Sequence, residues 1–427
     1  MFDERPIGDL IANQVGGGTP SRQVPSYWNG PIPWASVKDF TNGDSVISST
    51  QESITVQGLS ASASSLIPAG TPMICTRMAV GRSAFAPMDV AINQDVKALE
   101  PAVGTSRDYL LRLLQFVRPR AEAAAVGSTV KGIRIQDFLS ILAPIAPVVE
   151  QSCIAEILTA LDTTIRQTEA IIEKLKLVKQ GLLHDLLTRG IYANGELRPP
   201  QSQAPHLYKD SPLGWIPNEW ACVSLGELAD SSVIGPFGSD LVASDYRTGG
   251  VPIVFVRDVK VGRFIWKSNV FVSSAKAVAL SAHDVRPGDV IATKMGFPPC
   301  VAAAYPDSMP NGVITADIVR LRFNYDNVRS LWVVCSINDD AVVKQVEQIT
   351  AGVTRPKVTL RDVRNLVVRL PSIGEQDRIL ERVVGIDQRL DIEKISLDKL
   401  SLQKAGLMDD LLTGRVRVTP LLETLGA

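Results

Sequence analysis

The sequence lacks the residue patterns on which most catalytic and metal sites depend. It has only three histidines in 427 residues, and His184, His206 and His283 show no metal-ligand spacing. Neither a GxxxxGK(S/T) phosphate loop nor a GxSxG nucleophile elbow occurs. The cysteines form no CxxC pair, which predicts reduced thiols in a cytoplasmic protein; they are Cys75, Cys153, Cys222, Cys300 and Cys335. We therefore expect no catalytic residue, no metal and no cofactor bound by this chain.

Long apolar runs and a strong net charge are also missing. Lysine and arginine number 44 against 45 acidic residues, so the net charge of −1 does not by itself indicate nucleic acid. No apolar run is long enough to span a bilayer, and the N-terminus, "MFDERPIGDL", is acidic and has no apolar signal core. The chain is too long for one hydrophobic core, so two to four domains are expected.

What the sequence does contain is a duplication with a very long period. The stretch "EQSCIAEILTALD" begins at Glu150, and "EQDRILERVVGID" begins at Glu375, 225 residues later. At this offset residues 150–188 align with 375–413 without a gap, and the ends agree as "GLLHDLLT" and "GLMDDLLT". The same offset aligns Asp137 with Asp362 upstream. So long a period excludes a solenoid of short repeats and predicts two domain-plus-helix units.

Both copies of the repeat have the spacing of a coiled-coil seam, with steps that alternate between four and three residues. The apolar seam positions predicted to pair are Ile154, Leu158, Leu161, Ile165, Ile172, Leu175, Leu182 and Leu186 in the first copy, and Ile379, Val383, Ile386, Leu390, Leu397, Leu400, Leu407 and Leu411 in the second. Polar residues take the fifth and eighth places, Thr168 and Lys179 in one copy and Glu393 and Lys404 in the other. Each copy predicts a helix of 39 residues, about 58 Å long. The matched seams favour antiparallel pairing over two separate surface helices.

The globular segments repeat as well, with more divergence. "VPIVFVRDVK" from Val251 matches "IPWASVKDF" from Ile32, and "PGDVIATKM" matches "AGTPMICTR", with Arg77 taken as the counterpart of Lys294. We expect strands in these stretches, a short helix over residues 106–117, and a turn at "FPPC" from Phe297. The predicted fold is α+β: two globular α/β target-recognition domains joined by two long helices, which form an antiparallel coiled coil with a pseudo-two-fold repeat. The predicted segments are 1–148 (domain 1), 149–190 (helix 1), 191–212 (linker), 213–372 (domain 2), 373–414 (helix 2) and 415–427 (tail).

Several stretches together resemble the specificity subunit of type I DNA restriction–modification enzymes, over nearly the whole chain. They are "GGGTPSRQVPSYWNGPIPWASVKDF", "VAINQDVKAL", "GSTVKGIRIQDF", "SPLGWIPNEW" and both repeated helices. The second domain departs most, since only "GPFGSD" from Gly235 stands where the first has its "GGGTP" stretch. The resemblance implies a non-catalytic DNA reader in a phage-defence system. Each domain would read half of a split site, and the helices would space the halves.

The same resemblance implies the partners and cofactors. Double-stranded DNA, two methyltransferase (modification) subunits and restriction–translocase subunits would bind this chain, and no membrane would. S-adenosylmethionine and ATP with Mg²⁺ would be held by the partner subunits. Basic and polar residues in turns and at strand ends are the predicted DNA contacts: Thr19, Ser21, Arg22, Tyr27, Lys38, Arg77, Arg82, Arg257, Lys260, Lys294, Arg355 and Lys357.

Two other readings remain open from the residues alone. A coiled-coil adaptor would bind proteins through its two domains without DNA specificity, and the missing basic excess agrees with that. An enzyme with an unrecognised site could use Cys75 or Cys300, although the scarcity of histidine argues against general acid–base chemistry. A salt-dependent shift of duplex DNA would separate the DNA reader from both alternatives.

Overall fold

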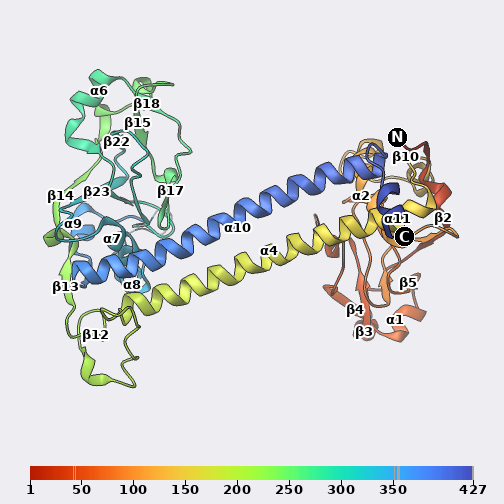
Figure 1. The fold of residues 1–427 in the computed structure, drawn as a ribbon, viewed down its shortest axis with the longest axis horizontal. Coiled ribbons are helices and arrows are strands. Elements are labelled where there is room, and N and C mark those ends of the chain that lie inside the picture. The colour runs from red at the N-terminus through yellow and green to blue at the C-terminus, as the bar shows by residue number, and fades with distance from the viewer. Residues whose placement is uncertain (42, 44, 351, 353–355, 426–427) are drawn as a thin grey trace. The chain divides into compact units, whose positions relative to one another are not determined.

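The chain is α+β and divides into two compact units (Figure 1). The computed structural model describes residues 1–41, 43, 45–350, 352 and 356–425. Unit 1 comprises Met1–Ile171 with Glu393–Ala427, and unit 2 comprises Ile172–Ile392. Each unit therefore holds one globular part and one half of each long helix. No helix among the described residues is long and apolar enough to cross a membrane.

The two repeated segments are both single long helices. Helix α4 spans Val148–Thr188 and helix α10 spans Ile373–Thr413, 41 residues each. Each begins two residues before the glutamate that opens the aligned repeat, Glu150 or Glu375, and ends on the threonine of the repeated "DLLT" stretch. Gly190 and Gly414 follow with φ angles of 64° and 71°, the left-handed conformation with which glycine commonly ends a helix.

Within each unit the two helix halves lie side by side in opposite directions. In unit 1, Lys404 Nζ lies 2.5 Å from Asp162 Oδ1, and in unit 2, Lys179 Nζ lies 2.6 Å from Asp387 Oδ1. Lys179 and Lys404 are equivalent positions of the repeat, and so are Asp162 and Asp387, so the same contact forms in both units. None of the twenty seam positions is exposed. The polar eighth place of each seam is therefore an ion-pair position, which fixes the register of the two helices.

The glutamate that opens each repeat holds the segment that follows the other long helix. In unit 2, Glu375 accepts hydrogen bonds from Arg198 Nη1 at 2.5 Å and from Ile191 N at 2.9 Å. In unit 1, Glu150 accepts a hydrogen bond from Arg417 Nε at 3.1 Å. Hydrogen bonding to Arg417 holds the pKa of Glu150 below its usual value, against the opposing effect of burial. Arg198 follows α4 and Arg417 follows α10, so the two contacts mirror each other.

The glutamine that follows each of these glutamates bonds to the globular part of its own unit. Gln151 Oε1 accepts the backbone N–H of Ser106 at 3.0 Å, and Gln376 Oε1 accepts that of Arg329 at 2.9 Å. Ser106 and Arg329 are the N-cap residues of helices α2 and α7. The repeated Glu-Gln pair is thus explained by two structural tasks, each performed once per unit.

The globular part of unit 1 contains two four-stranded sheets, one two-stranded ribbon and a buried helix (Figure 1). One sheet is antiparallel with the order β2-β9-β6-β7, and the other, β4-β3-β8-β5, contains the parallel pair β3 and β8. The elements are β1 Glu4–Pro6, η1 Ile7–Leu10, β2 Ile11–Gly16, η2 Pro25–Tyr27, β3 Trp28–Ala35, η3 Val37–Asp39, β4 Glu52–Ile54, α1 Val56–Ser60, β5 Ser65–Ile67, β6 Met73–Cys75, β7 Ser83–Ala84, β8 Val90–Ile92, β9 Val96–Pro101, α2 Arg107–Ala124, α3 Ile135–Leu139, β10 Leu142–Pro144 and, at the C-terminus, α11 Thr419–Leu425. The fully buried Tyr109 and Leu113 of α2 join its main core cluster, which also includes Leu158 of α4.

Unit 2 repeats the two four-stranded sheets and the ribbon, here β13-β24, and adds the two-stranded sheets β11-β12 and β16-β17. Its sheets have the orders β14-β23-β20-β21 and β18-β15-β22-β19, the second with β15 and β22 parallel. The elements are η4 Pro205–Leu207, β11 Tyr208–Lys209, β12 Ile216–Pro217, β13 Ala221–Ser224, α5 Leu225–Leu228, β14 Ala229–Ile234, η5 Gly238–Asp240, η6 Ala243–Asp245, β15 Val251–Val254, η7 Val256–Asp258, β16 Val259–Lys260, β17 Arg263–Phe264, β18 Phe271–Val272, α6 Ser274–Ala279, η8 Ser281–His283, β19 Asp284–Val285, β20 Val290–Thr293, β21 Ala302–Ala304, β22 Gly312–Ile314, β23 Ile318–Phe323, α7 Ser330–Ile337, α8 Asp340–Ile349, α9 Leu360–Asn365 and β24 Val367–Leu370. In its main core, Trp220 and Trp332 are almost fully buried and pack edge to face, with 5.7 Å between their ring centres.

The helix predicted over residues 106–117 is longer than expected. Helix α2 runs from Arg107 to Ala124 and continues past Pro119, although a proline inside a helix removes one backbone hydrogen bond. Val117 before the proline and Ala121 after it are both fully buried in the core of unit 1. Burial of this apolar face outweighs the local preference to stop.

Candidate nucleic-acid interface

The turn after strand β6 in unit 1 corresponds to the turn after β20 in unit 2. Arg77 forms an antiparallel bridge with Gly132, and Met295 forms the same bridge with Lys357. Gly132 and Lys357 are separated by the repeat offset, and the strands before both turns pair in the same register. Arg77 therefore corresponds to Met295, which corrects the alignment of Arg77 with Lys294. The chemistry of the two turns differs more than the sequence suggested.

Lys38 and Arg257 occupy equivalent, exposed positions on the short turns η3 and η7. The following aspartates close these turns from inside. The backbone N–H of Ser36 donates to Asp39 Oδ2 at 2.8 Å, and that of Phe255 donates to Asp258 Oδ2 at 2.9 Å. In each unit the aspartate therefore stabilises the turn, while the neighbouring Lys38 or Arg257 is exposed.

Arg22 is held in place by unit 1 itself. Its guanidinium makes a two-pronged ion pair with Glu52, with Nη2 at 2.9 Å from Oε2, and lies 3.7 Å from the centre of the Trp28 ring. The hydrogen bond to Arg22 lowers the pKa of Glu52, with burial acting in the opposite direction. Reading a base edge with this arginine would require breaking the pair, so its present contacts favour a structural role.

The two other arginines predicted in unit 1 differ in availability. Arg82 Nη1 donates to the backbone carbonyl of Phe40 at 2.8 Å, and its Nε is buried without a partner, so Arg82 is part of the fold. The side chain of Arg77 is 56% exposed, and its Nη1 lies 3.4 Å from Asp95 Oδ1. Arg77 can therefore still present guanidinium N–H groups to a ligand.

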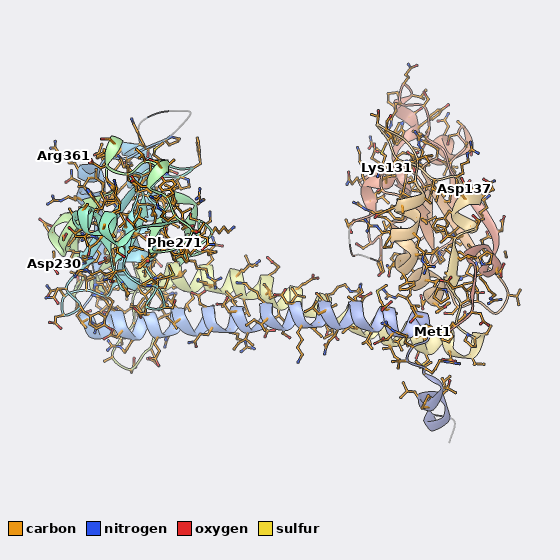
Figure 2. The ribbon with its side chains drawn as sticks, turned by 90° about the horizontal axis from the view of Figure 1, so that it is seen from above. Met1, Lys131, Asp137, Asp230, Phe271 and Arg361 are labelled. Atoms are coloured by element: carbon orange, nitrogen blue, oxygen red, sulfur yellow. The ribbon has the colours of Figure 1, made fainter. Side chains whose placement is uncertain are left out.

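The predicted polar residues of unit 1 lie on the neighbouring loop between β2 and β3. Thr19 is exposed and its Oγ1 donates to Gln94 Oε1 at 2.6 Å. The backbone carbonyl of Ser21 accepts a hydrogen bond from Trp28 Nε1 at 3.1 Å, and Tyr27 is half-buried on η2. The segment after α2, on which Figure 2 labels Lys131, meets the turn after β6 where Met78 N donates to Lys131 O at 2.9 Å.

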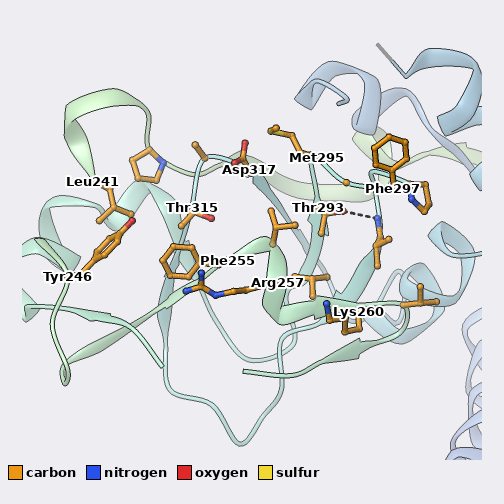
Figure 3. A pocket seen from close by; sticks show the side chains of 18 of the residues that line it. Leu241, Tyr246, Phe255, Arg257, Lys260, Thr293, Met295, Phe297, Thr315 and Asp317 are labelled. Carbon is orange, nitrogen blue, oxygen red and sulfur yellow. Dashed lines mark hydrogen bonds between the residues drawn. The ribbon is translucent and has the colours of Figure 1, made fainter. Parts of the chain in front are cut away.

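Two of the predicted residues of unit 2 line a hollow of about 770 Å³ (Figure 3). Arg257 and Lys260 line it, and the Arg257 guanidinium lies 4.4 Å from the centre of the Phe255 ring. Lys294 Nζ lies 4.9 Å from the centre of the Phe237 ring. Lys357 is exposed beside Met295, and Arg355 lies outside the described residues. Cationic side chains at such a hollow are of the kind that contact a phosphate backbone.

Comparisons with known proteins agree with this duplicated arrangement. A family model described as a type I restriction modification DNA specificity domain matches residues 2–177, which cover the globular part of unit 1 and most of α4. The MjaIX specificity subunit of Methanocaldococcus jannaschii is 23% identical over 439 residues, covering 98% of this chain and 94% of that protein. The EcoR124I/EcoR124II specificity subunit of Escherichia coli is 32% identical over 160 residues, 36% of this chain and 39% of that one.

Residues 2–177 match the type I DNA specificity family, and nearly the whole chain is similar to a specificity subunit of that kind. The crystal structure of a type I restriction–modification S subunit from M. genitalium covers 96% of both chains with a TM-score of 0.58 at 16% identity, which shows a shared fold.

The apolar part of this surface was not predicted from the sequence. Phe297 and Phe237 are 78% and 56% exposed, and Phe297 lines the hollow together with Met295 and Asp317. Attention to basic and polar residues passed over them. The single available signal was the "FPPC" stretch, whose aromatic residue stands in a turn.

The thiols do not support an enzymatic reading. Cys75 and Cys300 are buried, and burial raises the pKa of both thiols. A nucleophilic cysteine needs a thiolate, which these surroundings disfavour. Within the described part of the chain, no group of three or more histidine, cysteine, aspartate or glutamate residues could hold a metal ion.

Proposed function

We propose that this chain is the DNA-reading subunit of a type I restriction–modification complex, and that each globular part binds one half of a split, asymmetric site. The observation that carries the proposal is the outward cation at the same place on two copies of one fold, Lys38 on η3 and Arg257 on η7. Similar frames with different loop side chains suit two half-sites of different sequence. The two target-recognition domains would be residues 1–148 and 213–372.

The helices are proposed to form one antiparallel coiled coil that sets the distance between the half-sites. The Asp162–Lys404 and Asp387–Lys179 pairs support a single register, since each joins the same two repeat positions. The burial of the seam supports it too, because each of its twenty positions is buried or half-buried. Residues 149–190 and 373–414 would then be the spacers.

Methyl transfer and cleavage would belong to other subunits of the complex. Two methyltransferase subunits would dock on the helices and hold S-adenosylmethionine, and restriction–translocase subunits would hold ATP and Mg²⁺. In unit 2 a groove of about 600 Å³ supports a protein contact beside α4, because Leu177, Leu331 and Val384 line it and are exposed. A methyltransferase must unstack its target base, at a cost of a few kcal/mol, and binding energy from this subunit would offset that cost.

The test uses the full chain copurified with its methyltransferase and a duplex that carries the methylated sequence. Binding is measured across a salt series. Lys38→Ala and Arg257→Ala should each weaken binding and lower the salt slope by about one, because each removes a phosphate contact. Lys344→Ala, which changes an exposed lysine on α8, is the matched control and should leave the slope unchanged.

The adaptor alternative makes the opposite prediction. A complex that assembles with its methyltransferase but retains no duplex at any salt concentration would support an adaptor without DNA specificity. If DNA is bound but Lys38→Ala and Arg257→Ala leave the affinity unchanged, the turns η3 and η7 are not the DNA contacts and the observation that carries the proposal fails.

A further inference from the structure

The turns after β6 and β20 share their ends but not their tips. In unit 1 the residues with positive φ are Met78 at 62° and Gly81 at 79°; in unit 2 they are Gly296 at 149° and Cys300 at 65°. Two residues separate the first pair and three separate the second. The unit 2 turn is therefore one residue longer, and this longer tip carries the exposed Phe297.

The surrounding positions differ in the same direction. Gly17 and Gly235 are equivalent, because the strands before them, β2 and β14, pair in the same register. A Cβ added at Gly17 would lie 2.0 Å from the Ile92 carbonyl oxygen on β8, and one added at Gly235 would lie 2.5 Å from the Ile314 carbonyl oxygen on β22. Two residues later unit 1 has Thr19 and unit 2 has Phe237. Where unit 1 has Arg77, unit 2 has Met295. Unit 2 thus has the apolar side chains of Phe237, Met295 and Phe297 where unit 1 has polar and cationic ones. Met295 and Phe297 line the hollow, and Phe237 lies between its lining residues Pro236 and Gly238.

Cations surround this apolar surface. Arg257 and Lys260 line the hollow that Met295 and Phe297 also line (Figure 3). Lys294 Nζ lies 4.9 Å from the centre of the Phe237 ring. Asp317 is the one acidic residue among the lining residues. Apolar side chains beside several cations are complementary to nucleic acid, whose phosphates lie on either side of apolar base groups.

We propose that unit 2 recognises thymine in its half-site by packing the 5-methyl group against the surface of Phe237, Met295 and Phe297. The inference rests on the proposed function and deepens it. These side chains offer no strong donor or acceptor, and the apolar group that a base pair presents in the major groove is the thymine methyl. Arg257, Lys260 and Lys294 then contact the flanking phosphates. Unit 1 reads by different chemistry, because Arg77 presents donors suited to guanine O6 and N7.

The experiment uses the full chain copurified with its methyltransferase and the duplex identified by methylome sequencing. Each thymine is replaced in turn by deoxyuridine, which removes only the methyl group. The wild-type complex should lose about fourfold in affinity at one thymine position, the effect of burying about one methyl group. Phe297→Ala should bind the unmodified duplex more weakly by at least that factor and should no longer distinguish thymine from deoxyuridine there.

Two matched variants control for side effects. Phe297→Leu keeps an apolar side chain and should retain discrimination, and Val278→Ala changes an exposed apolar residue on α6 that does not line the hollow and should behave as wild type. Equal wild-type affinity for thymine and deoxyuridine at every position would overturn the inference. So would a Phe297→Ala complex that still discriminates, or one that loses its methyltransferase instead of its DNA, since the surface would then be a protein contact. A wild-type complex that binds no duplex would overturn the proposed function itself.

Discussion

Replacing Glu375 with glutamine tests how the repeated helix start stabilises unit 2. The Glu375 carboxylate is buried and bonds to Arg198, Ile191 N and Trp220 Nε1. Its counterpart Glu150 is equally buried, but the partner arginine of Glu150 is 47% exposed, whereas the side chain of Arg198 is only 6% exposed. The same substitution in two copies of one motif therefore leaves one arginine in the interior and the other in water.

The expected magnitude follows from the charge left behind. Removing one partner of a buried ion pair costs about 3–5 kcal/mol, because the remaining charge is uncompensated in a medium of low dielectric constant. Arg198 keeps a second partner, Glu219, at 2.7 Å, although that carboxylate is 72% exposed. The cost of Glu375→Gln is therefore expected at the lower end of this range, as a loss of about 3 kcal/mol in the free energy of unfolding. Glu150→Gln should reduce it by less, since water solvates the released guanidinium.

Urea unfolding of the purified chain, followed by tryptophan fluorescence, measures this difference. Unit 2 contains Trp215, Trp220, Trp266 and Trp332, and unit 1 contains Trp28 and Trp34, so the signal reports on both units. Trp220 Nε1 donates to Glu375 at 3.0 Å, and its emission should shift in Glu375→Gln even before unfolding. Equal losses in the two variants, or a larger loss in Glu150→Gln, would refute the reasoning from burial.

Three further outcomes are expected. The pKa of Glu150 is lower in the folded chain than in the unfolded chain, where it is about 4.3. Its contribution to stability is therefore present above pH 4.3 and is lost as the pH falls toward the folded pKa. Unfolding should consequently depend less on acid pH in Glu150→Gln than in wild type. Seven residues inserted after Thr168 and seven after Asp398 lengthen both helices by about 10 Å without breaking the seam, and methylome sequencing should show the gap between half-sites growing by about three base pairs while the half-sites stay the same. Leu158→Ala, at a fully buried position, should lower the free energy of unfolding by about 2–5 kcal/mol in a urea titration, whereas Leu177→Ala at an exposed position should leave stability unchanged and weaken copurification with the methyltransferase.

The helices were predictable because their signal is local and duplicated. The apolar steps from Ile154 and Ile379 and the repeated "DLLT" ends identify both helices to within two residues at the start. The role of the opening Glu-Gln pair was not predictable. Its partners Arg198 and Arg417 lie beyond the end of the other long helix, and no local pattern links residues so far apart.

The candidate interface was predictable only in outline. Lys38 and Arg257 are exposed at equivalent turns, as their shared pattern indicated. Arg22 and Arg82 are committed to Glu52 and to the Phe40 carbonyl, contacts that only tertiary folding creates. The one-residue difference between the two turns also escaped sequence alignment, because the flanking strands and not the side chains fix the register.

Methylome sequencing of cells that carry this chain with its methyltransferase tests the central claim most directly. Two recognition domains predict methylation within a split motif, whose halves are separated by unspecified bases. Arg77→Ala should relax or weaken one half, by about 1–3 kcal/mol if the arginine reads a base, and Lys294→Ala should affect the other half. A continuous motif, methylation that does not depend on this chain, or two substitutions that alter the same half would contradict one domain for each half-site.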